Sequence, residues 1–509
     1  MSQLFAKKSL QVLLDEMEGG NRLRRILGPV QLTSLGVGCI VGVGIFVVTG
    51  AVAHDQTGPA MMLSFAVAGL ACVFSALCYA EFASMVPVAG SAYTYAYATL
   101  GELLAWIIGW DLVLEYGVGA AFVANGWSSY FQDFIGMFGV HVPDTLRQAP
   151  FDFDAKTGLL QATAGICNLP AIVITAIIAL ILVKGIRESA SFNAGMVALK
   201  VVIVLFVVAV GAFYVNPQNW HPFAPYGYTG LSFFGHTVFG QTGADGKPLG
   251  MLAGAAISFI AFIGFDSVST HAEEARNPRR DVPIGIIASL LICTLLYAAV
   301  SAVLTGMVPY NELDIGAPVS KAFARAGLPW AQFIISLGAL AGITSVLLVL
   351  MLSQPRVLLA MARDRLLPAS FFGAVHPRFR TPWKSTLLTG LCVSILAGLL
   401  PLRFLMELVN IGTLLAFAIV CASVLIMRRT HPEAARAFRA PLVPLVPILG
   451  IAFCVLLMFS LPWQNWLRLG VWLVIGFVVY FGYGHRRSTL NPRNAVTLPA
   501  GAAAASPRR

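Results

Sequence analysis

The chain has 509 residues, of which 58% are hydrophobic and only 11% are charged, and its formal net charge is +10. A chain of this size carries more apolar surface than a soluble core can cover, so the composition excludes an ordinary soluble protein and indicates a lipid environment. In a soluble protein the basic excess would suggest a nucleic-acid partner, but here its placement relative to the membrane has to be considered first.

The N-terminal segment 1–30 is rich in charged residues and lacks the short apolar stretch and cleavage site of a secretory signal. We therefore predict a cytoplasmic arm, with the first apolar span directing the chain to the membrane. The eight cysteines lie in apolar spans or at their edges and show no CxxC spacing. They are interpreted as small core residues, and neither a metal site nor a cofactor is predicted.

Hydrophobic runs long enough to cross about 30 Å of hydrocarbon recur along nearly the whole chain. They leave no room for a soluble domain between them, so the predicted fold class is all-α and integral to the membrane. The twelve predicted spans are 33–53, 60–86, 99–127, 168–186, 192–214, 251–271, 283–307, 331–361, 385–401, 404–427, 443–461 and 466–484.

Twelve spans place both termini on one side of the membrane. If that side is the cytoplasm, 25 of the 33 Lys and Arg residues lie inside, seven lie outside, and Lys200 alone lies within the bilayer. This skew follows the positive-inside rule and predicts a multi-pass protein of the inner (plasma) membrane, with no nucleic-acid partner. Exterior segments 128–167 and 215–250 are expected to form ordered caps, and the tail 486–509 is expected to be disordered.

The first span contains Gly36, Gly38, Gly42 and Gly44 within the sequence LGVGCIVGVGIFVVTG. Each glycine costs about 1 kcal/mol of helix propensity relative to alanine. One interpretation is close helix packing through small residues, and the other is an unwound segment. A broken helix is tolerated in a bilayer only where protein or a polar cavity satisfies the freed backbone groups.

The sixth span contains a second candidate break, where Gly264 is followed by the mid-span carboxylate Asp266. Paired interruptions in corresponding helices of two inverted halves indicate a transporter's midplane site. Freed amides attract a carboxylate and freed carbonyls attract an ammonium, so two broken helices suit an amino-acid zwitterion.

Lys200 lies about nine residues into its span, which at 1.5 Å per residue is about 14 Å deep and close to the midplane. A charge at this depth costs roughly 2.5–3.5 kcal/mol or more, so it requires a partner or a use. It is either one half of a buried ion pair or a proton carrier, because an amine held out of water gives up its proton more readily.

Glu115 and Asp266 are the other two ionisable residues predicted at mid-membrane depth, and both are candidates for proton coupling or for structural hydrogen bonding. Asp111, one turn from Glu115, is given no transport role. The loop cluster of Glu273, Glu274, Arg279 and Arg280 is either a solvated face or an inner gate latch.

The chain resembles the amino acid–polyamine–organocation superfamily, and within it the bacterial relatives of the cationic amino acid transporters. The residues that carry the resemblance extend over nearly the whole chain. They are GVGCIVGVGIFVVTG, NWHPFAPYG at 219–227, AFIGFDSVSTHAEEARNPRRDVPIGI and QPRVLLAMARDRLLP at 354–368.

The resemblance implies a transport core over 31–430, made of two inverted five-helix repeats at about 31–215 and 250–430, and two peripheral helices in 440–485. It places the substrate carboxylate at amides of the first span and the ammonium at carbonyls of the sixth. The implied substrate-binding residues are Ile40, Val43, Gly44, Ile45, Ile260, Ala261 and Ile263.

Two positions refine this expectation. Lys200 matches a lysine that, in proton-coupled relatives, stands where sodium-coupled ones hold a cation, so the resemblance favours protons. Val43 occupies a position that is often a hydroxyl or small residue in relatives, so no side-chain hydrogen bond is available there.

We therefore predict a secondary active transporter, not an enzyme, that couples proton entry to amino-acid uptake by alternating access, with preference for neutral amino acids. Its expected partners are amino-acid substrate, protons and the bilayer, and a small accessory membrane subunit is left open. The alternatives are a sodium-coupled or exchange permease, a polyamine or amine carrier, and an integral membrane enzyme. The sequence shows no grouping of His, Asp and Glu residues that would support the membrane enzyme.

Overall fold

The protein is built mainly of helices that are long and apolar enough to cross a membrane. The computed structural model describes residues 3–8, 27–85, 91–154, 159–184, 190–243, 248–272, 275–379 and 381–491. Within them, eight stretches have the length and hydropathy of membrane spans, and the first, Pro29–Met85, contains two passes. Three shorter apolar helices bring the total in the described residues to twelve, which confirms the predicted fold class.

The passes lie close to the predicted spans. The first is interrupted and comprises α2 (Pro29–Ile40), η2 (Gly44–Val48), α3 (Thr49–Val52) and η3 (Ala53–Thr57). The sixth is also interrupted and comprises α9 (Met251–Ser258), η7 (Phe259–Phe262) and α10 (Ser267–Thr270). The others are α4 (Met61–Met85), α6 (Glu102–Gly136), α7 (Leu169–Lys184), α8 (Ala190–Gly211), α11 (Pro278–Met307), α13 (Pro329–Arg363), α15 (Trp383–Leu399), α16 (Leu402–Thr430), α17 (Leu445–Ser460) and α18 (Trp463–Val479).

Corresponding helices of the two predicted halves pack against each other. The second and seventh passes, α4 and α11, lie side by side, as do the third and eighth, α6 and α13, and the fourth and ninth, α7 and α15. The two interrupted passes also touch, through α2 with α10 and η2 with η7. The inverted five-helix repeat itself, which would relate each of these helices to its neighbour by a pseudo-two-fold axis, stays a prediction.

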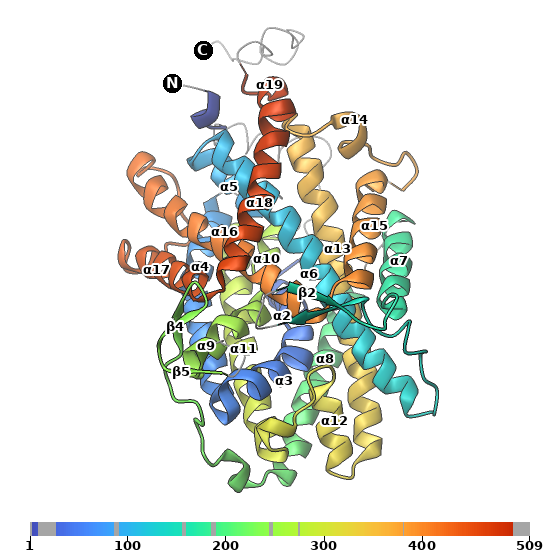
Figure 1. Cartoon of the computed structure of the whole chain (residues 1–509). Helices are drawn as coiled ribbons and strands as arrows, with labels where there is room; N and C mark the ends of the chain where they lie inside the picture. Colours follow the sequence, from blue (N-terminus) through green and yellow to red (C-terminus); the bar gives the residue numbers. More distant parts are fainter. Residues whose placement is uncertain are drawn as a thin grey trace, which may run out of the picture.

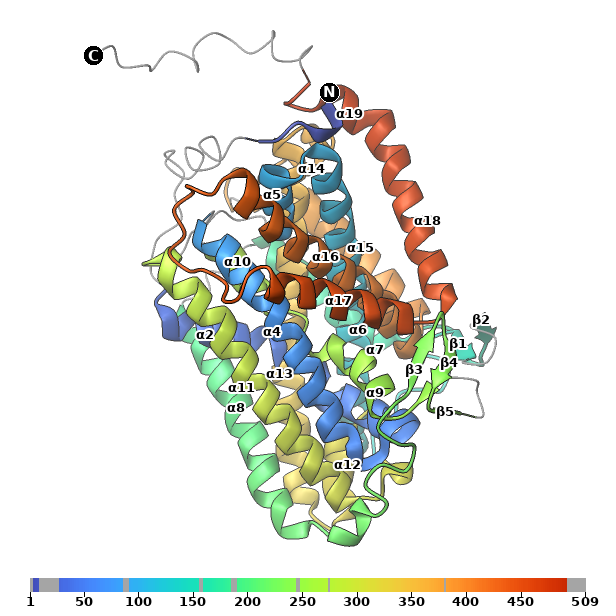
Figure 2. The same cartoon turned by 90° about the vertical axis from the view of Figure 1, so that its left-hand side faces the viewer.

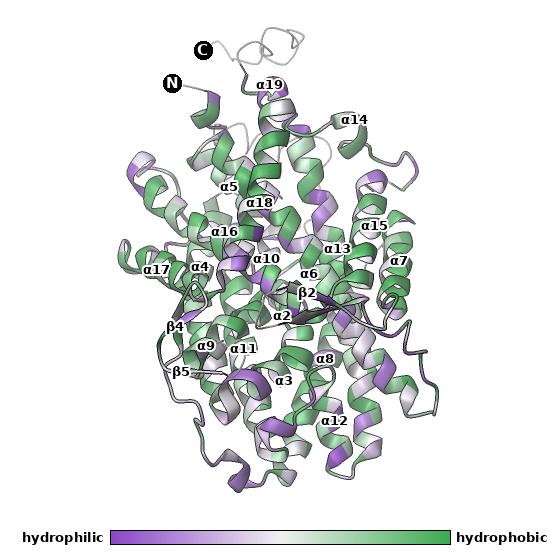
Figure 3. Ribbon diagram, in the orientation of Figure 1, coloured by the Kyte–Doolittle hydropathy of each residue, from purple (hydrophilic) through white to green (hydrophobic). Residues whose placement is uncertain are grey.

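Both ends of the described chain lie at one end of the bundle, which we call the near end. There η1 (Gln3–Phe5) lies beside α19 (His485–Arg487), and α12 (Pro318–Arg325) lies at the opposite, far end (Figures 1 and 2). Hydrophobic residues cover the outer helices α7, α15 and α17, whereas hydrophilic residues gather in the connecting loops (Figure 3). This distribution fits a bundle surrounded by hydrocarbon.

The connections contain small structured elements that the sequence did not predict in detail. In the described part of the chain, the predicted caps contain three two-stranded antiparallel sheets, and a helix, α5 (Ser91–Thr99), precedes α6. The remaining helical pieces are η4 (Gly58–Ala60), η5 (Ala212–Tyr214), η6 (Pro217–Trp220), η9 (Tyr310–Glu312), α14 (Ala369–Phe372) and η10 (Tyr480–Gly484). The strands are β1 (Phe151–Asp154), β2 (Leu159–Ala162), β3 (Leu231–Phe233), β4 (His236–Phe239), β5 (Gln241–Thr242) and β6 (Pro248–Leu249).

A buried ion pair joins α4 to α16. The carboxylate of Glu81, 2% exposed, accepts hydrogen bonds from Arg428 Nε at 2.9 Å and Nη2 at 2.7 Å, and from the Ala440 amide at 2.8 Å. Arg436 Nε lies 3.2 Å from the same carboxylate. Paired and hydrogen-bonded in this way, the charge is tolerable in the interior.

Arg428→Ala is expected to lower the free energy of unfolding by about 1–3 kcal/mol, because it removes two charge-assisted hydrogen bonds from a buried carboxylate. Arg429→Ala, at the exposed neighbouring position, is the matched control and should change stability by less than about 0.5 kcal/mol. Thermal unfolding of the purified variants in detergent measures both. Equal melting temperatures for the two variants would contradict a stabilising role for this pair.

Asp314 fixes the segment before α12 at the far end. Its Oδ1 accepts from the amides of Gly316 and Ala317, each at 2.8 Å, and its Oδ2 accepts from Lys321 Nζ at 2.6 Å. Partial burial raises the pKa of this carboxyl, but the hydrogen bonds and the Lys321 charge outweigh burial and hold the pKa below its usual value.

The stabilisation from Asp314 is therefore expected to be present above its unfolded pKa of about 4 and to be lost as the pH falls through the lower folded pKa. Proteolysis of the far-end loop, followed from neutral to acidic pH, should show increasing cleavage near α12 only at the acidic end. Asp314→Asn should make cleavage at this site much less dependent on pH. If wild type and variant follow the same pH curve, the assignment to Asp314 is wrong.

Candidate functional site

The two predicted helix breaks are present and lie in the middle of the bundle. Helix α2 ends at Ile40, Val41 is extended with φ −72° and ψ 101°, and helical structure resumes at Gly44. In the sixth pass, helical structure ends at Phe262, Ile263 has ψ 133°, and α10 begins at Ser267. Gly264 lies in this gap with φ +115°, a conformation that residues with a Cβ rarely adopt.

The glycines of the first pass serve close packing as well. A Cβ at Gly36 would lie 2.6 Å from the Cβ of Ser289 on α11, and one at Gly38 would lie 2.5 Å from Val197 on α8. A Cβ at Gly42 would lie 2.6 Å from Val346 on α13. Both interpretations of the glycine pattern therefore hold, because the pass is broken and its glycines also let three neighbouring helices approach its backbone.

The two breaks are in direct contact with each other. A Cβ at Gly44 would lie 2.8 Å from the Cα of Ala261 and 2.9 Å from the hydroxyl oxygen of Tyr297. That hydroxyl, from α11, lies 2.7 Å from the carbonyl oxygen of Ile40 and 2.8 Å from that of Ala261. Ile40, Ala261 and Tyr297 are at most 3% exposed, so the contact is inside the protein.

Tyr297 is the residue of this site that the sequence interpretation missed. Its signal was a polar aromatic residue in the middle of the seventh span, where a hydroxyl requires a hydrogen-bond partner. Spacing alone could not indicate that its partners would be the carbonyls of two other passes.

The other predicted binding residues line the same breaks. Val43 precedes η2 and faces Gly126 of α6, whose Cβ would lie 3.0 Å from Val43 Cγ1. The Ile45 amide donates to the Gly42 carbonyl at 3.2 Å, whereas Gly44 begins a helical segment, where N–H groups have no acceptor within the helix. Ile260 lies in η7 and Ile263 follows it.

Lys200 is buried at the contact of α8 with the first pass. Its side chain is 1% exposed, and Nζ donates to the Gly38 carbonyl at 2.6 Å, two residues before α2 ends. Among the described residues it forms no ion pair, so the predicted alternative of a partner carboxylate is not what the structure contains. Its stem packs on α13, where a Cβ at Gly342 would lie 3.4 Å from Lys200 Cγ.

Glu115 and Asp266 come together on the α6 side of the sixth-pass break, in a group separate from Lys200. Glu115 interacts electrostatically with Asp266, and Asp266 Oδ2 accepts from the Tyr116 hydroxyl at 3.0 Å. Both carboxyl groups are at most 1% exposed. Within the described residues no cluster of His, Cys, Asp and Glu has the arrangement of a metal site.

Ionic contacts tie the site's helices at both ends of the bundle. At the far end Asp55, at the end of the first pass, pairs with Arg403 of α16 at 2.6 Å, and its other carboxylate oxygen is hydrogen-bonded to the neighbouring His54 at 2.7 Å. At the near end Asp364, after α13, pairs with Lys8 at 3.1 Å and accepts from Tyr93 at 2.6 Å.

The predicted loop cluster lies only partly within the described residues. Glu273 and Glu274 fall outside them, whereas Arg279 and Arg280, in the first turn of α11, are exposed. The solvated face and the gate latch therefore both stay predictions.

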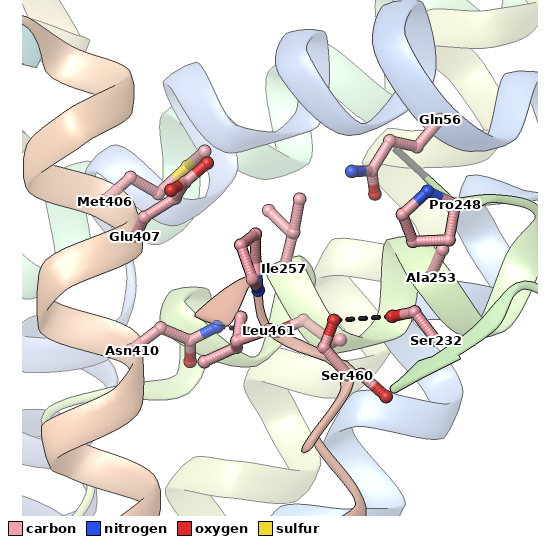
Figure 4. Close-up of a pocket in the computed structure, with 12 residues that line it drawn as sticks. Gln56, Ser232, Pro248, Ala253, Ile257, Met406, Glu407, Asn410, Ser460 and Leu461 are labelled. Atoms are coloured by element: carbon pink, nitrogen blue, oxygen red, sulfur yellow. Dashed lines mark hydrogen bonds between the residues drawn. The ribbon is translucent and has the colours of Figure 1, made fainter. Parts of the chain in front are cut away.

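A small, mainly apolar cavity of about 40 Å³ lies toward the far end, apart from the two breaks. It is bounded by α9, α16, the β3 and β6 strands and the α17–α18 connection, with Glu407 and Asn410 facing Gln56 across it (Figure 4). The Asn410 amide donates to the Ala256 carbonyl of α9 at 2.7 Å. This hydrogen bond connects α16 to α9, the helix that leads into the sixth-pass break.

Comparison with known proteins finds permeases and transporters that match this chain over most of its length. Residues 27–481 match the family model described as amino acid permease. The chain is 45% identical over 491 residues to the methylthioribose transporter of Bacillus subtilis (strain 168), covering 96% of this chain and 100% of the relative. It is 46% identical over 489 residues to the branched-chain amino acid permease BcaP of the same organism, covering 96% and 99%. It is also 38% identical over 434 residues to the vacuolar cationic amino acid transporter 4 of Arabidopsis thaliana, covering 85% and 68%.

Proposed function

Because the chain belongs to the amino acid permease family, we propose that it is a secondary active transporter that takes up amino acids by proton symport with alternating access. The resemblance to the amino acid–polyamine–organocation superfamily is confirmed, and the chain is a multi-span membrane transporter rather than an enzyme. We further propose that it lies in the plasma membrane with its near end in the cytoplasm. The core 31–430 with two repeats, the peripheral helices in 440–485 and an accessory subunit stay predictions.

One observation carries the proposed ammonium site. The Tyr297 hydroxyl has a single hydrogen, yet it lies within 2.8 Å of two carbonyl oxygens, those of Ile40 and Ala261. It can donate to only one of them at a time, so this buried group of oxygens lacks a donor. An ammonium with three N–H donors would supply it, which supports binding of a primary amine between the two breaks.

The proposed carboxylate site lies opposite. Helical structure runs from Gly44 to residue 57, so the positive end of this helical segment and its free amides face the break. Val43 and Gly44 supply these amides in the proposal. In this proposal, the contact of Gly44 with Ala261 brings the two subsites near enough for one amino acid to reach both.

The proposed coupling uses Lys200. When charged, its ammonium holds the Gly38 carbonyl and therefore the end of α2; when neutral, it holds that carbonyl less strongly. Loading and unloading this amine from alternate sides would link a proton to the position of the first pass. Glu115 and Asp266 are proposed as further coupling residues.

For the substrate we propose a neutral amino acid. A relative 46% identical is named a branched-chain amino acid permease, whereas another, 45% identical, is named a methylthioribose transporter. Methylthioribose has neither an ammonium nor a carboxylate, so it would leave both proposed subsites unused. The donor-deficient carbonyls beside Tyr297 therefore favour the amino acid over the sugar.

The direct test is uptake of radiolabelled leucine, lysine and methylthioribose into proteoliposomes under an imposed pH gradient, and separately under a sodium gradient. Leucine accumulation driven by the pH gradient alone is expected. Accumulation driven by sodium with protons equilibrated would replace the proton mechanism. Competition by amines that lack a carboxylate would favour an amine or polyamine carrier, and preferential sugar uptake would exclude the zwitterion site.

Tyr297→Phe is expected to raise the KM for the amino acid by roughly tenfold, because it removes the hydroxyl oxygen, one of the proposed acceptors of the ammonium, and the loss of one buried hydrogen bond costs about 1–3 kcal/mol. Initial uptake rates across a concentration series measure it. Tyr214→Phe, at a position 43% exposed, is the control. An unchanged KM in Tyr297→Phe would place the ammonium elsewhere.

A further inference from the structure

A group of three carboxyls, which we call the acidic cluster, lies beside the sixth-pass break. Asp111 and Glu115 stand one turn apart on α6, and Asp266 precedes α10. Their exposed fractions are 1%, 1% and 0%. Glu115 interacts electrostatically with both other members, and a Cβ at Gly412 of α16 would lie 2.8 Å from Asp111 Oδ1.

Within the described residues, no basic side chain forms an ion pair with any member of the acidic cluster. Both oxygens of Asp111, both of Glu115 and Oδ1 of Asp266 are without a hydrogen-bond partner in the same residues. Thr413 lies beside Glu115, but its hydroxyl donates to the Val409 carbonyl at 3.2 Å. Asp266 Oδ2, in contrast, accepts from the Tyr116 hydroxyl.

A tyrosine on another helix gives an independent indication that the acidic cluster binds something. Tyr79 of α4 is 0% exposed, its hydroxyl has no partner among the described residues, and it interacts electrostatically with Asp266 and Glu115. A buried hydroxyl without a partner costs about 1–3 kcal/mol, so it is expected to share in the hydrogen bonding of whatever the cluster holds.

The titratable groups around the cluster are all neutral or acidic. No basic group is among them in the described part of the chain, and no metal-binding arrangement is found there. Tyr79 on α4, Tyr95 on α5 and Tyr116 on α6 interact with members of the cluster, and Cys421 on α16 interacts with Tyr79.

Three carboxylates cannot all be ionised together in such surroundings. An unpaired buried charge costs several kcal/mol, and like charges a few ångströms apart add to that cost. Neighbouring carboxyls in proteins resolve this conflict by holding protons between them. A carboxyl that holds a proton also becomes a donor for the oxygens beside it.

We propose that Asp111 and Glu115 form a proton-binding site of their own, separate from Lys200, that holds at least one proton while the protein is in this conformation. Asp111 has no role in the coupling proposed above, and it lies closer than Glu115 to the near end of the bundle. The role of this site in transport rests on the proposed proton symport, but its occupancy by protons does not.

Infrared spectroscopy of the full-length protein in lipid vesicles tests the proposal directly, because a protonated carboxyl has a C=O stretching band distinct from that of a carboxylate. Spectra at neutral pH are compared for wild type, Asp111→Asn, Glu115→Gln and the control Asp144→Asn, whose side chain is 80% exposed. The expected result is loss of protonated-carboxyl intensity in either cluster variant and no loss in the control. Unchanged intensity in both cluster variants would overturn the proposal.

Transport is measured on the same samples as acidification-driven leucine uptake. Asp111→Asn is expected to shift the pH dependence of uptake relative to Asp144→Asn while leaving the protein folded, as judged by its melting temperature. If Asp111→Asn fails to fold, the infrared spectrum of Glu115→Gln alone tests the proposal. Loss of the protonated-carboxyl band supports the proposal, and an unchanged band overturns it. The band could be lost in the cluster variants while wild type shows no proton-driven uptake. That result would retain the proton-binding site and reject the proposed symport.

Discussion

Lys200→Ala is expected to abolish accumulation of amino acid against its gradient while leaving the protein in the membrane. The substitution removes a buried amine and its 2.6 Å hydrogen bond to the Gly38 carbonyl at the end of α2. Without that amine, the Gly38 carbonyl loses the donor whose protonation is proposed to control the end of α2. Uptake driven by a pH gradient should fall by at least about tenfold, which corresponds to about 1.4 kcal/mol, whereas exchange of labelled for unlabelled amino acid should persist.

The measurement compares gradient-driven uptake with exchange in the same proteoliposomes. Lys384→Ala is the control, because this partly buried lysine donates only to the Ser370 carbonyl, at a long 3.4 Å, and not to the first pass. Lys200→Arg extends the test, since a guanidinium stays charged and should hold α2 without releasing it. Accumulation by Lys200→Ala at the wild-type level would show that the coupling proton binds elsewhere.

Gly44→Ala is expected to reduce uptake by about 10- to 100-fold through a different mechanism. The added methyl would lie 2.8 Å from the Ala261 Cα and 2.9 Å from the Tyr297 hydroxyl. Backbone cannot move aside as a flexible side chain can, and overpacking of this kind costs about 1–3 kcal/mol. Because the methyl stands between the two breaks, the cost falls on the proposed binding site.

Uptake kinetics and thermal unfolding, measured together, separate a damaged site from a damaged fold. Gly470→Ala is the matched control, because a Cβ at that glycine of α18 meets nothing within 4 Å. Gly44→Ala should lose transport while its melting temperature falls by only a few degrees. Wild-type uptake in Gly44→Ala would mean that the breaks separate widely during transport and that their contact here does not define the site.

The acidic cluster and Lys200 show where residue-by-residue prediction was strong and where it was incomplete. Hydropathy placed both Lys200 and Glu115 inside the membrane, because the apolar run on either side of each charge is long enough to hold it at mid-span depth. A position toward the cytoplasmic end of a span suggests access to the interface, so the sequence assigns Asp111 no role. In the structure it is 1% exposed, because Gly412 lets α16 pack directly over it.

The sequence by itself predicted the membrane environment, the twelve passes and the positions of two candidate helix breaks. These properties depend on local composition: apolar length sets a span, and glycines with a mid-span carboxylate mark its interruption. Only the tertiary structure decided that Tyr297 bridges the two breaks, that Lys200 meets a carbonyl rather than a carboxylate, and that Asp111 joins Glu115. Each of these contacts depends on helices far apart in sequence, and the packing that brings them within hydrogen-bond or van der Waals distance has no local signal.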